Sequence, residues 1–267
     1  MIIHGNPELL KDKLLFVVDM DGTFYLDNNL FDGSLEFIEK ICSTHKEFLF
    51  FTNNSSKPLD FYIRKLQNMG CFISTKEIMN STMVTIGYIK SKYQNPSVYV
   101  VGTEAVLDEI KKSGINIVEE DNPDIVLITF DTELTYEKLS KACHFVRGGS
   151  IFLATHQDYN CPVINGFIPD CGAICSLITA STGVIPKYIG KPHIETMEAI
   201  ISYKGIDKDK IAVIGDRLYT DIALGTNHGV TSILVMTGET TLDLLNASKN
   251  KPDIVAERLS DITTFLI

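Results

Sequence analysis

The stretch Leu-Leu-Phe-Val-Val-Asp-Met-Asp-Gly-Thr, residues 14–23, decides the fold of this chain. Its apolar first half is typical of a strand buried in a parallel sheet, and open α/β sheets bind ligands at the carboxyl ends of such strands. Asp19 and Asp21 stand at that end. Because residues two apart in extended backbone point to the same side, both carboxylates can face one substrate, while Gly22 permits a sharp turn. The alternative is an ordinary turn, in which Asp and Gly are common.

Short apolar runs alternate with amphipathic stretches along the chain, which predicts an α/β fold built on parallel strands. The predicted strands are residues 14–19, 47–52, 97–101, 124–130, 150–154, 187–189, 211–214 and 232–235. The predicted helices lie near residues 33–43, 57–69, 103–113, 135–146, 172–181 and 220–227. A capping-box spacing from Ser74 to Glu77 predicts one further helix that reaches toward Tyr93.

Composition narrows the class of protein. With 267 residues, 45% of them hydrophobic and 22% charged, the chain is typical of a globular protein with room for a core and an inserted domain. A net charge of −10 argues against coating nucleic acid, because that binding needs Lys and Arg to neutralise phosphates. The six cysteines form no CxxC pair, so we expect reduced thiols and no zinc site. With no signal peptide pattern and no apolar run near the roughly 18 residues that cross a bilayer, we expect a cytoplasmic protein that does not bind membranes.

Two further predicted strands end in polar residues. The second strand runs into Thr52-Asn53-Asn54-Ser55-Ser56, just before a helix N-terminus that favours anions, so phosphate oxygens would suit this segment. Its alternative role is a plain N-cap with polar loop residues. The strand at 211–214 leads to Asp216, and Asp221 follows in the next helix, with a turn and a helix cap as their alternative roles.

These acids are expected to share the sheet edge that holds Asp19. Crowded carboxylates repel one another and have raised pKa values unless a cation lies among them, and Mg²⁺ is the hard, oxygen-liganded ion that best resolves this. Gly190-Lys191-Pro192 supplies a positive charge after a short strand. It is not a Walker A lysine, since Ile185 and Pro192 stand where that motif needs Gly and Ser or Thr. A lone lysine is usually a solvated surface group, so a functional role for Lys191 depends on which groups surround it.

Four segments together resemble the haloacid dehalogenase superfamily: DMDGT at 19–23, TNNSS at 52–56, GKP at 190–192 and GDRLYTD at 215–221. The long gap between the second and third segments resembles the inserted α/β cap of subclass IIA, in particular that of NagD-like and 4-nitrophenylphosphatase-like phosphatases. The stretches 154–158 and 169–173 look like that group's cap-to-core region. The resemblance implies a doubly wound, Rossmann-like core at residues 1–78 and 183–267, with an inserted α/β cap domain at 79–182.

The resemblance also implies roles for individual residues. Asp19 is expected to be the nucleophile and Asp21 the general acid and base. Phosphate is expected to bind at Thr52 and Asn53, with Asn54 beside them, and Lys191 to neutralise its charge. Mg²⁺ is expected to bind Asp19, Asp216 and the backbone carbonyl of Asp21, with Asp221 ordering that site.

Two departures from the family pattern leave the substrate open. His156 stands where relatives often have Asn, and Asp170-Cys171 replaces smaller residues in the cap loop that faces the active site in relatives. We expect Asp170 and Cys171 to contact the substrate. An acid at 170 would disfavour highly anionic leaving groups.

The expected activity is a Mg²⁺-dependent phosphatase that forms an aspartyl-phosphate and hydrolyses sugar, polyol or nucleoside monophosphates. Its partner would be a small phosphorylated metabolite rather than nucleic acid or a membrane, and the resemblance makes a homodimer reasonable. A dehalogenase is disfavoured because it needs neither the metal cluster nor an acid at Asp21. A phosphomutase and a non-catalytic phosphate-sensing module remain as alternatives.

Overall fold

A computed structural model describes residues 1–163 and 166–266. The chain divides into two compact units, which we call unit 1 (residues 1–52, 63–79 and 191–267) and unit 2 (residues 53–62 and 80–190). The predicted α/β class is confirmed, because both units are built on mostly parallel sheets joined by helices. The domain boundaries predicted from the motifs, at 78/79 and 182/183, remain a proposal.

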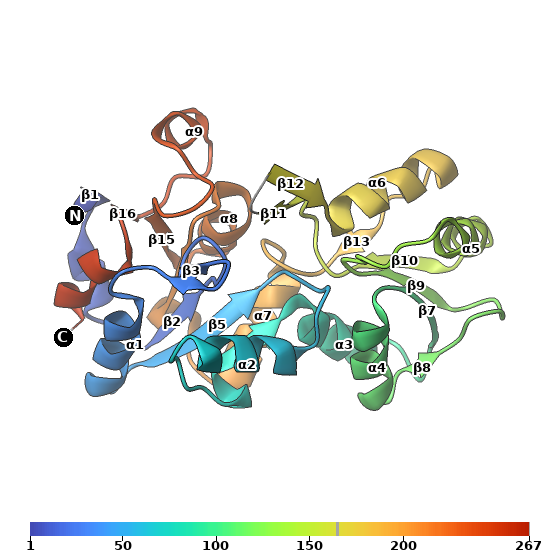
Figure 1. Cartoon of the computed structure of the whole chain (residues 1–267), viewed down its shortest axis with the longest axis horizontal. Coiled ribbons are helices and arrows are strands. Elements are labelled where there is room, and N and C mark those ends of the chain that lie inside the picture. The colour runs from blue at the N-terminus through green and yellow to red at the C-terminus, as the bar shows by residue number, and fades with distance from the viewer. Residues whose placement is uncertain (164–165, 267) are drawn as a thin grey trace. The chain divides into compact units, whose positions relative to one another are not determined.

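Unit 1 is built on a seven-stranded sheet in the order β1-β16-β15-β14-β2-β5-β6. Its strands are β1 (Ile2–Gly5), β2 (Leu15–Val18), β5 (Glu47–Thr52), β6 (Ile78–Asn80), β14 (Ile211–Gly215), β15 (Thr231–Val235) and β16 (Ile254–Ala256). Strand β2, which lies beside β5 in Figure 1, pairs in parallel with both β14 and β5, so that Val17 lies between Val213 and Leu49. The carboxyl ends of these three strands therefore lie at one edge.

Helices and a small hairpin complete unit 1. The hairpin joins β3 (Tyr25–Leu26) to β4 (Asn29–Leu30). The helices are α1 (Ser34–Ser43), the second half of α2 (Leu59–Asn68), α7 (Ile194–Lys204), α8 (Ala223–His228) and α9 (Leu242–Ala247). Short 3₁₀ turns lie at Pro7–Leu10, Thr75–Glu77, Lys208–Lys210, Leu259–Asp261 and Thr263–Phe265. Aromatic rings pack these layers together, as in the edge-to-face pair of Phe24 and Phe50, whose centroids are 4.7 Å apart.

Unit 2 has its own parallel sheet, in the order β13-β10-β9-β7-β8, and an antiparallel hairpin. The sheet contains β7 (Ser97–Val101), β8 (Asn116–Ile117), β9 (Ile125–Ile128), β10 (Ile151–Ala154) and β13 (Lys187–Tyr188); the hairpin contains β11 (Asn160–Val163) and β12 (Gly166–Pro169). The helices α3 (Ser81–Lys92) and α4 (Glu104–Lys112) cover one face, and α5 (Tyr136–Arg147) and α6 (Cys171–Thr182) cover the other (Figure 1).

Alternation along the strands of unit 2 explains its two apolar layers. On β9, Val126 and Ile128 pack toward α5 and α6, whereas Ile125 and Leu127 pack toward α3 and α4. This is the period of two that a strand imposes, applied to a strand that is apolar on both faces. The continuous apolar run in the sequence follows from this double burial.

Two predicted helices differ from the observed ones. The helix predicted to open at Ser74 is wrong: the capping box is present, but it caps only the 3₁₀ turn Thr75–Glu77, and β6 follows as the edge strand beside β5. Helix α3 begins at Ser81 instead, where the side chain of Asn80 accepts a hydrogen bond from the amide of Met83. Before α8, a π-helical turn at Leu218–Ile222 replaces the predicted regular start near residue 220.

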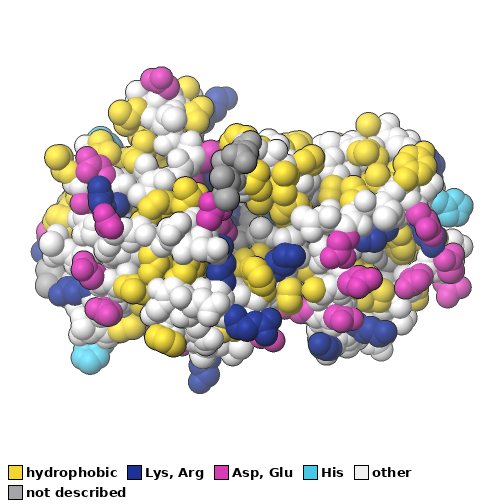
Figure 2. Space-filling view, viewed as in Figure 1, with side chains coloured by type: hydrophobic (Ala, Val, Ile, Leu, Met, Phe, Trp, Pro, Cys, Tyr) yellow, Lys and Arg dark blue, Asp and Glu magenta, His cyan; other side chains and the backbone are white. Residues whose placement is uncertain are grey.

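Acidic and basic side chains are interspersed over the visible face in Figure 2. In the described part of the chain, all six cysteines are free thiols, as predicted. None of the described helices is both long and apolar enough to span a bilayer.

Candidate active site

Strand β2 places the first acidic pair of unit 1. The amide of Asp19 donates to the carbonyl of Ile214, which continues the pairing of β2 with β14 beyond the last regular residue. The chain then turns sharply at Gly22, whose φ of +87° is strained for any residue with a side chain. A Cβ there would also lie 2.6 Å from a carboxylate oxygen of Asp216. Gly22 is therefore required both by the turn and by the acid that approaches it.

Strand β14 and the π-helical turn place the second acidic pair. A Cβ at Gly215 would lie 2.1 Å from the carboxyl carbon of Asp221, so only glycine lets that side chain approach the strand. Asp221 is held by the amide of Arg217, which donates to its Oδ2 at 3.2 Å. Asp216 accepts from the amide of Glu239 at 2.7 Å and from the hydroxyl of Thr23 at 3.3 Å.

Lys191 joins the two pairs. Its Nζ lies 2.6 Å from Oδ1 of Asp19 and 2.7 Å from Oδ1 of Asp221, and it also donates to the carbonyl of Phe51 at 3.2 Å. The residue is 2% exposed. Burial alone would lower the pKa of Lys191, but Asp19 and Asp221 outweigh it and raise the pKa, so the side chain stays an ammonium.

The carboxylates of Asp19, Asp216 and Asp221 form a cluster whose ligand atoms lie within 4.8 Å of one another. Burial raises the pKa of Asp19 well above its usual value, and Asp221 and Asp216 raise it further against the opposing effect of Lys191. Burial and the neighbouring Asp221 raise the pKa of Asp216 to about 6. Burial is the largest cause of both raised values, and repulsion between the neighbouring carboxylates adds to it.

Asp21 stands beside this cluster with partners that sequence reasoning missed. The hydroxyl of Tyr25 donates to Oδ2 of Asp21 at 3.2 Å, and Nζ of Lys65 lies 3.7 Å from Oδ1. Burial raises the pKa of Asp21, opposed by Lys65 and the hydrogen bond from Tyr25. In the sequence, the contact between Tyr25 and Asp21 is suggested only by their separation of four residues. Nothing in the sequence suggests that Lys65 lies near Asp21.

The TNNSS segment is divided between the units. Thr52 ends β5 in unit 1 and is buried, whereas Asn53 and Asn54 belong to unit 2. The side chain of Asn54 accepts hydrogen bonds from the amide and the hydroxyl of Ser56, at 3.0 and 2.7 Å. This is the role of a polar loop residue, the alternative to phosphate binding. Nδ2 of Asn53 donates to Oδ2 of Asp158 at 3.2 Å.

A second charged cluster is buried within unit 2. The ring of His156 lies between two acids, with Nδ1 3.4 Å from Oδ2 of Asp158 and Nε2 3.5 Å from Oδ1 of Asp170. Burial alone would lower the pKa of His156, but Asp170, Cys171 and Asp158 outweigh it and raise the pKa to about 9. His156 is therefore an imidazolium at neutral pH.

The two cap residues predicted to contact substrate lie in or beside this cluster. Asp170 precedes α6 and accepts from the amide of Cys171 at 2.6 Å. Cys171 has no exposed surface, packs in the apolar layer beneath α6 and donates its thiol to the carbonyl of Ile128 at 3.5 Å. Both side chains are interior groups of unit 2 in this conformation.

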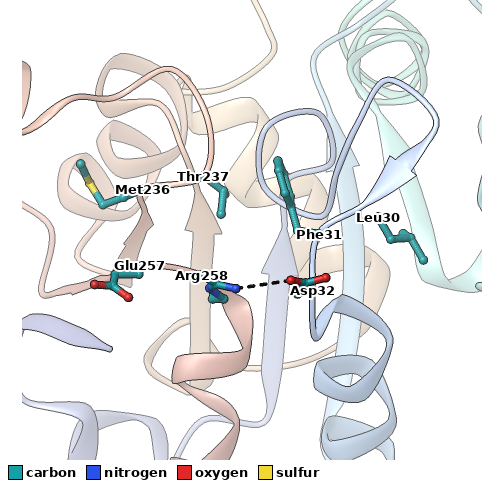
Figure 3. A pocket seen from close by; sticks show the side chains of 7 residues that line it. All are labelled: Leu30, Phe31, Asp32, Met236, Thr237, Glu257 and Arg258. Carbon is teal, nitrogen blue, oxygen red and sulfur yellow. Dashed lines mark ion pairs between the residues drawn. The ribbon is translucent and has the colours of Figure 1, made fainter.

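Elsewhere in unit 1, a pocket of about 430 Å³ is lined by residues at the end of β4 and just after β4, β15 and β16. In Figure 3, Asp32 and Arg258 face each other across it, with Nη1 of Arg258 3.7 Å from Oδ2 of Asp32. None of the site residues predicted from the sequence lines this pocket. The structure thus brings Asp19, Lys191, Asp216 and Asp221 together in unit 1, with Asp21 beside them.

Comparisons with known proteins agree with this geometry. The profile of the family described as haloacid dehalogenase-like hydrolase matches residues 16–116, and a related HAD-hydrolase-like profile matches residues 188–262. An acid sugar phosphatase of Staphylococcus epidermidis is 34% identical over 243 residues, which are 91% of this chain and 94% of the relative.

Solved structures give the same result. The structure of a 4-nitrophenylphosphatase from Thermotoga maritima has a TM-score of 0.92 and 42% identity, and the match covers 96% of this chain and 98% of that chain. The NagD protein of Escherichia coli K-12 has a TM-score of 0.86 and 27% identity, over 93% of this chain and 98% of its own.

Proposed function

The chain belongs to the haloacid dehalogenase-like hydrolases, as one of their NagD-like phosphatases, and from this premise we propose that it hydrolyses small phosphate monoesters with Mg²⁺ through an aspartyl-phosphate on Asp19. One observation carries the proposal: the buried ammonium of Lys191 contacts both Asp19 and Asp221 at the edge where β2 and β14 end. A fixed cation beside a carboxylate nucleophile is what the transfer of a charged phosphoryl group requires.

The names of the relatives support a substrate class. One is an acid sugar phosphatase and another a 4-nitrophenylphosphatase, so both act on small phosphate monoesters. We extend this to sugar, polyol and nucleoside monophosphates for the present chain. The proposed partner is accordingly a small phosphorylated metabolite, and a cytoplasmic location and a homodimer stay predictions.

The donor set of unit 1 fits Mg²⁺. Three clustered carboxylates provide the oxygen ligands that this ion prefers, and burial together with the neighbouring acids raises the pKa values of Asp19 and Asp216. Asp19, Asp216 and the backbone carbonyl of Asp21 would hold the ion, and Asp221 would order the site. A bound Mg²⁺ supplies positive charge against the phosphoryl oxygens.

The side chains of unit 1 have distinct tasks in this reaction. An oxygen of Asp19 attacks phosphorus, the ester P–O bond breaks, and Asp21 gives its proton to the departing oxygen. Asp21 then takes a proton from the water that attacks the aspartyl-phosphate. The P–O bond to Asp19 breaks, inorganic phosphate leaves and the carboxylate is restored. Lys191 offsets charge on the phosphoryl oxygens, and Thr52 and Asn53 are the proposed phosphate contacts.

Selection of the leaving group by Asp170 and Cys171 stays a prediction. Asp170 is 3% exposed and Cys171 is fully buried, so a direct contact with substrate requires unit 2 to rearrange. Replacing Asp170 with Ala and ranking a broad panel of phosphate esters tests it. An unchanged ranking leaves Asp170 with only its role at the start of α6.

Asp19→Asn tests the proposed function directly. We expect kcat to fall at least about 10³-fold, because the amide cannot serve as the nucleophile. The measurement is phosphate release from p-nitrophenyl phosphate and glycerol phosphate, with and without Mg²⁺. Asp12→Asn is the matched control, because the Asp12 side chain is 57% exposed and lies outside the carboxylate cluster.

The outcome separates the alternatives. An Asp19→Asn variant with activity close to wild type contradicts the assignment of the nucleophile. A wild-type protein that releases no phosphate with Mg²⁺ supports the phosphate-sensing module. Transfer of phosphate to a second position of a sugar, rather than to water, supports the phosphomutase.

A further inference from the structure

The carboxyl group of Asp21 is held from two directions. The hydroxyl of Tyr25 donates to Oδ2 at 3.2 Å, and the ammonium of Lys65 lies 3.7 Å from Oδ1. The Asp21 side chain is itself 37% exposed, so packing alone does not fix it. Its orientation therefore depends on these two polar neighbours.

The two neighbours are also held by each other. The ammonium of Lys65 lies over the Tyr25 ring, 4.0 Å from its centroid, in a cation–π contact. Tyr25 is fully buried, and its backbone closes the turn after β2: its carbonyl accepts from Gly22 at 2.8 Å and its amide donates to Met20 at 3.2 Å. Tyr25 is thus a rigid group that both donates to Asp21 and positions Lys65.

We propose that Tyr25 and Lys65 are positioning residues that hold Asp21 for proton transfer to the departing oxygen of the substrate. This inference rests on the proposed function, in which Asp21 is the general acid. When Asp21 gives up its proton, negative charge develops on its carboxyl oxygens, which face the ammonium of Lys65 and the hydroxyl of Tyr25. Groups fixed in advance where charge develops lower the barrier, because they need no reorganisation during the reaction.

The inference makes a selective prediction about substrates. An alkoxide such as that of glycerol phosphate leaves only with a proton from the acid, whereas nitrophenolate is stable enough to leave without one. The comparison uses kcat/KM, which reports steps up to release of the first product and excludes the hydrolysis of the aspartyl-phosphate that both substrates share.

The test uses Tyr25→Phe, which keeps the buried ring, and Lys65→Met, which keeps the length of the side chain. For each variant, we expect the ratio of kcat/KM for glycerol phosphate to that for p-nitrophenyl phosphate to fall at least about tenfold. We expect Lys65→Arg to restore most of the ratio, because it restores the positive charge. Tyr203→Phe and Lys76→Met are matched controls in unit 1, where both residues are exposed, and they should leave the ratio unchanged.

Two results would overturn the inference. The ratio could stay at the wild-type value, including the case in which both substrates lose kcat/KM equally, or only KM could rise, which would make Lys65 a substrate-binding group. Thermal unfolding of each variant shows whether an equal loss reflects a damaged fold. If the wild-type protein releases phosphate from neither substrate, the proposed function fails; if it turns over both and the variants show no split, this inference alone fails.

Discussion

Each unit of this protein buries a cluster of acids around a cation, and the two clusters differ in their balance of charge. The cluster of unit 1 contains Asp19, Asp216 and Asp221 with Lys191. The cluster of unit 2 contains Asp158 and Asp170 with His156. In the first, one ammonium contacts two of three carboxylates; in the second, each ring nitrogen faces one carboxylate.

Exposure separates the two clusters at one residue. The Asp19 side chain is 13% exposed and stands where strands end, whereas Asp216 and Asp221 are as buried as the three side chains of unit 2, none of which exceeds 5%. In unit 1 the pKa values of Asp19 and Asp216 are raised as well as that of Lys191, and in unit 2 the pKa of His156 is raised. We infer that excess acid at an accessible edge serves to bind a cation and a substrate, whereas enclosed acids around one imidazolium hold loops and α6 in place.

The largest expected effect comes from removing each cation. Lys191→Met and His156→Asn should each lower the free energy of unfolding by about 3–5 kcal/mol, because each leaves buried carboxylates without their partner. Urea unfolding of the two variants, with and without Mg²⁺, sharpens the comparison. We expect Mg²⁺ to restore stability to Lys191→Met only, since a bound ion replaces the missing charge. If Mg²⁺ raised the free energy of unfolding of both variants equally, the two clusters would not differ in their ability to bind a cation.

The next effect is the pH dependence of unit 2. The pKa of His156 is raised from 6.5 to about 9 in the folded protein, so its stabilising effect is fully present below pH 6.5 and is lost as the pH rises through 9. Asp158, Asp170 and Cys171 are the titratable groups that act on it.

The expected loss between these pH values is about 3 kcal/mol, at about 1.4 kcal/mol for each pKa unit. The measurement is the difference in unfolding free energy between wild type and His156→Asn, followed from pH 6 to 10. His144→Asn, on the exposed side of α5, is the matched control. A difference that does not change with pH would contradict an imidazolium at position 156.

A smaller effect compares one acid from each cluster. Asp216→Asn should weaken activation by Mg²⁺ at least about 100-fold, because it removes a proposed ligand, and changes to groups behind the ligands already cost 10–100-fold. Asp158→Asn should leave the Mg²⁺ dependence unchanged. Titration of phosphatase activity with Mg²⁺ measures both, and a similar shift in the two variants would show that the clusters do not have separate roles.

The smallest effect concerns the start of α6. Asp170→Ala should be less stable than Asp170→Asn by about 1 kcal/mol, because both variants lose the charge opposite His156 but only Asn keeps an oxygen for the amide of Cys171. Urea unfolding measures the difference. Equal stability of the two variants would mean that the hydrogen bond contributes nothing.

Much of the site's scaffold could be predicted because its signals are local. The run at 47–52 is confirmed as β5, and the runs that end at Asp19 and Asp216 are confirmed as β2 and β14, within one residue at the ends. Since neighbouring parallel strands end at a common edge, the acids after them were expected together. The clustering of Asp19, Asp216 and Asp221 around Lys191 follows from that rule.

What could not be predicted depends on contacts between distant segments. The capping box at Ser74 is a local signal for a helix, but the pairing of β6 with the sheet edge overrides it directly after Glu77. Lys65 is an unremarkable helical lysine until the fold brings it to Tyr25. His156 stood out only as a departure from the family, because nothing in the sequence places Asp158 and Asp170 on opposite sides of its ring.

The stereochemical course at phosphorus tests the central claim, that phosphate passes through Asp19, most directly. A phosphorothioate monoester made chiral with oxygen isotopes is hydrolysed in isotopically labelled water, and the configuration of the product is determined. Two in-line displacements, first by Asp19 and then by water, predict net retention. Net inversion would mean that water attacks the ester directly, and no aspartyl-phosphate would then exist.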